Sequence, residues 1–106
     1  MSDVLDQITD SSVQAAKYEL KALLSEAKAD SDSFYSENAR LLEERLEMVR
    51  DGRLEKDDFL DFIEVQKGSA EVFVRSQAVD GQARAERLTV HVLEIAATKI
   101  LPILLV

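Results

Sequence analysis

The chain has 106 residues, of which 46% are hydrophobic and 32% are charged, so its size and composition are those of one globular domain, residues 1–106. Its net charge of −8 repels phosphates and argues against direct nucleic-acid binding, while the absence of cysteine excludes disulfides and thiolate metal sites and favours a cytoplasmic protein. With three glycines and one proline, the chain is poor in the tight turns of sheet proteins, and an all-α fold is expected.

Residues 3–29 are predicted to form the first helix. Apolar and small side chains recur there at intervals of three and four residues, the spacing of one helix face. The predicted face consists of Leu5, Ile8, Ser12, Ala16, Leu20, Leu23 and Ala27. The pair Ser11-Ser12 is a weak point at which this segment could be two helices. The polar run 30–33 ends the helix and supplies the N-cap of the next one.

Residues 33–51 show the clearest helical pattern in the chain. The predicted buried face consists of Tyr35, Ala39, Leu42, Leu46 and Val49. Gly52 follows directly and is predicted to be the C′ residue, in the left-handed conformation, at the start of a short loop at 52–54.

Residues 55–79 are predicted to form a third helix with two apolar seams. The first seam consists of Phe59, Ile63, Ala70 and Phe73. The second consists of Phe62, Val65, Val72 and Val79, with the small residues Ser69 and Ser76 between them. Because each seam requires a neighbour, this helix is expected at the centre of the bundle.

The dipeptide Asp80-Gly81 is a turn signal, and it predicts a break before a fourth helix at 82–104. The alternative is that the third and fourth helices continue as one rod, which would be roughly 70 Å long at the helical rise per residue.

The segment 82–104 is nearly apolar apart from one narrow polar stripe. At helical spacing this stripe consists of Arg84, Arg87, His91, Glu94 and Thr98. Residues 100–106 carry no polar side chain, so the helix is expected to need cover from a bundle, a second subunit or a membrane. The predicted interface residues are Leu88, Val92, Ile95, Ile100, Leu101, Ile103 and Leu104.

No motif points to catalysis or to a cofactor. Residues 51–59, DGRLEKDDF, look like the second half of a calcium-binding EF-hand loop, but Val49 offers no side-chain oxygen at the third loop position. His91 is the one histidine, and helical metal sites need more ligands than His91 and Glu94 supply, so it is interpreted as a hydrogen-bonded residue of the polar stripe. We therefore predict no catalytic residue, no metal, no cofactor and no enzymatic activity.

These observations predict an antiparallel bundle of three or four helices with short loops, completed by oligomerisation. The favoured function is that of a small acidic interaction protein. It would form a homo-oligomer, most simply a dimer, or dock onto a partner protein through coiled-coil-like apolar faces, with the C-terminal helix as its anchor. The alternative is a membrane-associated protein whose residues 88–106 insert in or lie on a bilayer.

Overall fold

The computed structural model describes residues 3–105, and within this range it contains helices and their connections but no strand. The first part of the chain forms α1 (Asp3–Asp6), the 3₁₀ turn η1 (Ser11–Val13), α2 (Gln14–Lys28), α3 (Ser33–Arg50) and α4 (Lys56–Arg75). The second part forms α5 (Val79–Glu86), the π-helical η2 (Arg87–His91), α6 (Val92–Ile95), the π-helical η3 (Ala96–Ile100) and α7 (Leu101–Leu104). These last five elements follow one another without a gap and are together called the C-terminal helix, residues 79–104. The predicted all-α class is confirmed.

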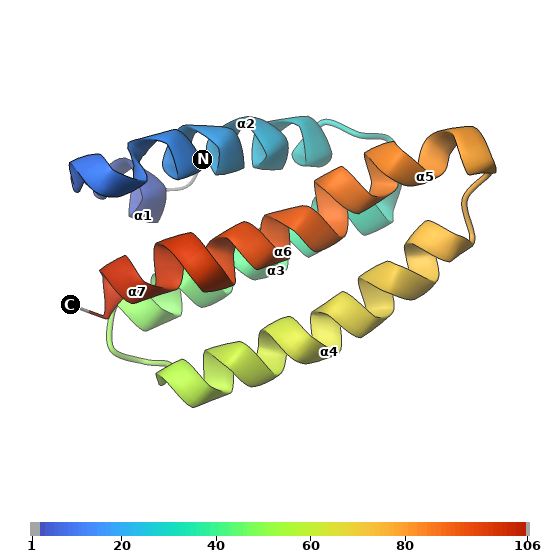
Figure 1. Cartoon of the computed structure of the whole chain (residues 1–106). Helices are drawn as coiled ribbons and strands as arrows, with labels where there is room; N and C mark the ends of the chain where they lie inside the picture. The colour runs from blue at the N-terminus through green and yellow to red at the C-terminus, as the bar shows by residue number, and fades with distance from the viewer. Residues whose placement is uncertain (1–2, 106) are drawn as a thin grey trace.

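The C-terminal helix lies at the centre of the fold. Figure 1 shows it between α2 and α4, with α3 behind it, and it contacts all three of these helices. Helix α3 in turn packs against α2 and α4, and the assembly measures 41 × 25 × 20 Å. The prediction that the third helix occupies the centre was therefore wrong, because Val65 and Val72 of its second seam stay exposed, although Phe62 of that seam packs against the core.

The central position of the C-terminal helix explains its composition. Leu88, Val92, Leu93, Ala96 and Ile100 are all fully buried. Burial of each large apolar side chain contributes roughly 1.5–3 kcal/mol, so this helix supplies much of the stability of a small domain. With neighbours on three sides, the middle of this helix, residues 87–98, meets water mainly along the polar stripe.

The predicted helix at 3–29 is broken at residues 7–10. The carboxylate of Asp10 accepts a 2.8 Å hydrogen bond from the backbone N–H of Ser12, which makes Asp10 an N-cap for a new helical start. Backbone carbonyls freed by the break are satisfied by side chains, because Lys17 and Gln14 donate to the carbonyl of Ile8 at 3.0 and 3.2 Å. The sequence weak point at Ser11-Ser12 thus lies just after the real interruption.

The break between the third and fourth helices exists, but it lies at residues 76–78 instead of at Asp80-Gly81. The hydroxyl of Ser76 and the amide of Gln77 both donate to the carbonyl of Phe73, which ends α4. Asp80 occupies the first turn of α5, where its negative charge suits the helix dipole. An Asp-Gly pair therefore begins a helix here instead of forming a turn.

The remaining chain reversals follow the sequence signals. The Asp32 side chain caps α3 by accepting from the backbone N–H of Phe34 at 3.0 Å. Gly52 has a φ of 75°, which is the left-handed conformation predicted for the C′ residue that follows α3. Both predictions are confirmed, because each depends on a local hydrogen bond or torsion and not on distant packing.

One buried polar pair lies between α3 and α4. Gln66 donates a 2.8 Å hydrogen bond to the side-chain oxygen of Asn38, which is 1% exposed. The side-chain nitrogen of Asn38 has no hydrogen-bond partner among the described residues. Because an unsatisfied buried donor costs about 1–3 kcal/mol, the double variant Asn38→Leu/Gln66→Leu is expected to be at least as stable as the wild type. Urea denaturation of the wild type and the double variant measures this difference. Asn38→Leu alone is expected to be less stable than the double variant, because it leaves the side-chain amide of Gln66 without its acceptor. A loss of stability in the double variant would show that the pair is needed for packing.

Candidate functional site

The polar stripe of the C-terminal helix is matched by charged groups on the helices beside it. From α2, Glu26 pairs with Arg87 at 3.5 Å and Glu19 lies 3.1 Å from His91. From α4, Lys67 reaches Glu94 at 3.3 Å. The stripe therefore serves to dock the central helix between α2 and α4, and His91 is the hydrogen-bonded stripe residue that was predicted.

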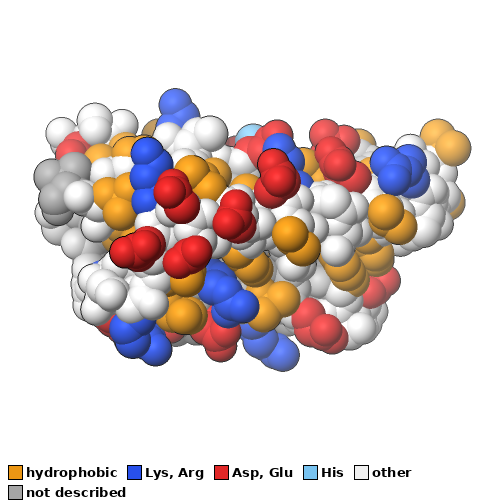
Figure 2. All heavy atoms as spheres, turned by 90° about the horizontal axis from the view of Figure 1, so that it is seen from below, with side chains coloured by type: hydrophobic (Ala, Val, Ile, Leu, Met, Phe, Trp, Pro, Cys, Tyr) orange, Lys and Arg blue, Asp and Glu red, His pale blue; other side chains and the backbone are white. Residues whose placement is uncertain are grey.

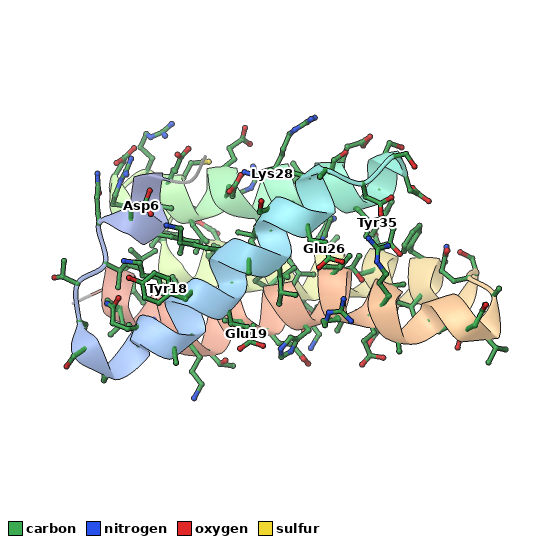
Figure 3. The ribbon with its side chains drawn as sticks, turned by 90° about the horizontal axis from the view of Figure 1, so that it is seen from above. Asp6, Tyr18, Glu19, Glu26, Lys28 and Tyr35 are labelled. Carbon is green, nitrogen blue, oxygen red and sulfur yellow. The ribbon has the colours of Figure 1, made fainter. Side chains whose placement is uncertain are left out.

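Arg84 is the most connected member of the stripe. Its guanidinium lies 2.8 Å from Asp30 and 3.3 Å from Glu26, and it sits 5.3 Å from the ring centre of Tyr35. Figure 3 shows Glu26 and Tyr35 near one another at the end of α2, where α3 begins. This cluster ties the α2–α3 connection to the start of the C-terminal helix.

Acid should weaken this cluster. The backbone N–H of Asp32, followed by the Arg84 guanidinium, lowers the pKa of the Asp30 carboxyl from its usual value of 3.8. The unfolded chain therefore binds a proton at this carboxyl more readily than the folded chain does. The stability that Asp30 contributes to the fold is present above the unfolded pKa and is lost as pH falls through the lower folded pKa. Asp30→Asn should therefore be less stable than the wild type at neutral pH, with the difference shrinking in acid.

Chemical denaturation at neutral pH and near pH 3 measures this dependence. Glu37→Gln is the matched control, because Glu37 is exposed on α3 and no resolved interaction depends on its charge. A stability difference for Asp30→Asn that stays constant with pH would contradict the assignment.

A groove of about 700 Å³ runs over the C-terminal helix between α2 and α4. Its apolar lining includes Val13, Ala16, Ile63 and Ala97, and its polar lining includes the Glu19–His91 and Lys67–Glu94 pairs together with Lys99. Both acidic residues in the lining already have a partner, Lys67 for Glu94 and His91 for Glu19. Lys99 forms no ion pair with any residue in the described range.

The structure places five of the seven predicted interface residues inside the chain's own core. Leu88, Val92, Ile95, Ile100 and Leu101 are buried, with Ile95 the most exposed of them at 6%. The other two, Ile103 and Leu104, are half-buried. A second molecule can therefore reach only Ile103 and Leu104 of this set unless the bundle opens.

The apolar C-terminal segment also bears on the membrane alternative. Of the helices within residues 3–105, none is long and apolar enough to cross a bilayer. Val106, the last residue of the predicted membrane segment, lies outside the described residues.

The loop that looks like an EF-hand fragment is used for ion pairs. Asp51 interacts with Arg50 at 3.0 Å and with Arg53 at 3.4 Å, so its oxygens serve the α3–α4 connection. In the described part of the chain, no group of three or more histidine, aspartate or glutamate side chains gathers as a metal site would require.

The outer face of α4 carries two of the most exposed large apolar side chains in the described range. Val65 is 71% exposed and Val72 is 60% exposed, and Val79, just beyond the end of α4, is 87% exposed. These valines come from the second seam of the sequence prediction, while Phe59, Ile63 and Ala70 of the first seam are buried. The sequence pattern thus detected these apolar residues but assigned them to a neighbour that the described chain does not supply.

We define the α4 outer face by its exposed residues, which are Asp61, Val65, Gly68, Ser69, Val72, Arg75 and Ser76. Figure 2 views the molecule from the side of α4 and shows apolar patches separated by acidic and basic side chains. A Cβ atom added to Gly68 would meet nothing within 4 Å. A glycine inside a helix costs about 1 kcal/mol relative to alanine, and packing within the chain gives no reason for that cost.

Two charged residues of the face, Asp61 and Arg75, have no ion-pair partner in the described part of the chain. Asp61 and Arg75 each lie seven residues from Gly68, on opposite sides of it, and neither forms an ion pair with another described residue. Asp61 thus lies at one end of the face and Arg75 at the other, and the exposed Glu64 and Glu71 lie beside this face. At 1.5 Å per residue the two charges are about 21 Å apart along α4, too far to meet within one helix.

Comparisons of this chain with protein-family models, with curated proteins and with solved structures found no match.

Proposed function

We propose that the protein is a small structural interaction protein, built as an antiparallel four-helix bundle, that binds protein partners through the α4 outer face. The observation that supports this function is the exposure of Val65 and Val72, seven residues apart on a helix whose opposite seam is buried. A seven-residue apolar repeat is the spacing by which one helix packs along another. The short connections drawn in Figure 1 support the alternating helix directions of this proposed bundle.

This proposal moves the contact surface from the C-terminal helix to α4. The apolar side chains of the C-terminal helix already have neighbours in α2, α3 and α4, so their burial requires no second molecule. Val65 and Val72 of α4 have no such cover, and two exposed apolar side chains seven residues apart on one helix face have the spacing by which one helix packs along another. The partner is therefore expected to present a helix with a matching apolar stripe.

A photo-crosslinking amino acid at Ser69 tests the proposal in the full chain, expressed in the cells that make it. Ser69 is exposed and adjoins Val65 and Val72, so a partner seated on α4 should be captured as one dominant adduct. The same probe at Glu37, exposed on α3, is the control and should give no such adduct. Adding Val72→Lys should abolish the Ser69 adduct, because a buried lysine without a partner is costly. Equal labelling from both sites would contradict the proposal.

The groove over the C-terminal helix supports a second candidate function, the binding of a small amphipathic anion. Its volume of about 700 Å³ lies within the usual range of ligand pockets. An apolar ligand body would lie along Ala16, Ile63 and Ala97, and an acidic head group would meet the unpaired Lys99. Titration with decanoate tests this: Lys99→Glu should weaken any binding, whereas Val72→Lys on the far surface should not. Identical binding by both variants would place decanoate elsewhere.

A further inference from the structure

We propose that the partner on the α4 outer face is a second copy of this chain, with the two α4 helices packed antiparallel across a twofold axis at Gly68. This inference rests on the proposed function, since it names the partner of the same face. It has two independent supports, which are the open space at Gly68 and the placement of Asp61 and Arg75.

Gly68 permits a close approach at the crossing point. It lies between the exposed Val65 and Val72 near the middle of the outer face, and space around its Cα is open in the single chain. The separation of two packed helices depends on the side chains at their contact, so a glycine beside Ser69 allows the backbones to come close. Val65 of one chain then lies along Val72 of the other, and both side chains become less exposed to water.

The charges select the direction of packing. With the axis at Gly68, Asp61 of one chain faces the partner's Arg75, because both residues are seven positions from the axis. The twofold symmetry forms this ion pair twice. A parallel arrangement would instead bring Asp61 against its own copy and Arg75 against its own copy, so two like-charge contacts oppose it.

The contact area implies a weak, reversible dimer. Helix α4 has 20 residues and is therefore about 30 Å long, and one helix stripe covers less than the roughly 800 Å² per partner of a standard stable interface. Association is expected at micromolar to millimolar concentrations, so the mass measured in solution should rise from 11.9 kDa towards twice that value as the chain is concentrated.

Sedimentation equilibrium of the full chain with a charge exchange tests the arrangement. Arg75→Glu should weaken association about tenfold, because it turns both ion pairs into repulsions. Adding Asp61→Arg to that variant should restore association, since the pair is re-formed with its signs reversed. Arg40→Glu makes the same change in net charge on an exposed position of α3 and should leave the dissociation constant within about twofold.

Substitutions at Gly68 and at Gly81 separate an effect on folding from an effect on dimerisation. No atom lies within 4 Å of a Cβ added at Gly68 or at Gly81, so Gly68→Ala and Gly81→Ala should both fold and should both raise the melting temperature of the monomer by a few degrees. Gly68→Leu should weaken the dimer at least tenfold while remaining folded, and Gly81→Ala should not weaken it.

The outcomes distinguish this inference from the proposed function. A chain that stays at 11.9 kDa up to millimolar concentration overturns the second copy as partner, although a Ser69 adduct with a different protein would still support the function. Dimerisation that Arg75→Glu and Gly68→Leu leave unchanged overturns the proposed geometry. Restoration by Asp61→Arg supports it directly, because these two residues cannot meet within one helix.

Discussion

A chain shortened by deletion of residues 100–106 is expected to lose its cooperative unfolding transition or to unfold at a much lower temperature. The deletion removes Ile100 and Leu101, which are 0% and 2% exposed, together with the half-buried Ile103 and Leu104. The first two side chains alone contribute about 3–6 kcal/mol through burial, a large part of the roughly 5–15 kcal/mol available to a small domain.

Thermal unfolding followed by circular dichroism measures this loss. Leu105→Ser is the matched control, because Leu105 is 46% exposed near the same end of the chain and should change the midpoint little. If residues 100–106 served mainly as an interface, the shortened chain would instead be a stable helical species with an unchanged midpoint. That result would show that residues 100–106 do not contribute to the core.

Replacement of Phe59 by alanine is expected to cost about 3–5 kcal/mol of unfolding free energy. Phe59 is fully buried and is the largest of the fully buried side chains in the described range. Its ring centre lies 6.1 Å from that of Phe62, so the change also removes an aromatic neighbour. The cavity would lie in the first seam of α4, whose burial the sequence predicted.

Urea denaturation at low protein concentration measures the effect of Phe59→Ala without a contribution from association. Leu60→Ala, one position further along α4, is the matched control because Leu60 is 36% exposed and should cost about 1 kcal/mol or less. Equal losses from the two variants would mean that α4 is rotated relative to its described position.

The helical segments could be predicted because their signals are local. Periodic apolar residues located α3 to within one residue, and Asp32 and Gly52 marked its two ends through a capping hydrogen bond and a left-handed torsion. The break at residues 7–10 and the position of the break at 76–78 were missed. In both places side-chain hydrogen bonds, from Lys17 to Ile8 and from Ser76 to Phe73, stabilise an interruption that residue type alone does not reveal.

The candidate site was detected in part, but its neighbours were assigned wrongly. The seven-residue spacing of Val65 and Val72 was visible in the sequence, as was the stripe that holds His91. Which of two apolar helices becomes the central one is not a local property, since it depends on how many neighbours each finds. The C-terminal helix is the central one because it packs against three helices, α2, α3 and α4. Helix α4 keeps Val65 and Val72 of its second seam exposed.

The all-helical class of this protein, the positions of its helices to within a few residues, and the apolar face of each helix can be predicted from the sequence alone. These properties follow from backbone torsions, caps and periodicity, which act over at most a few turns. Only the tertiary structure decided which apolar faces meet inside the chain and which remain uncovered. That choice depends on the summed burial of all the helices at once, and it leaves exposed the α4 outer face, which we propose as the surface for a partner.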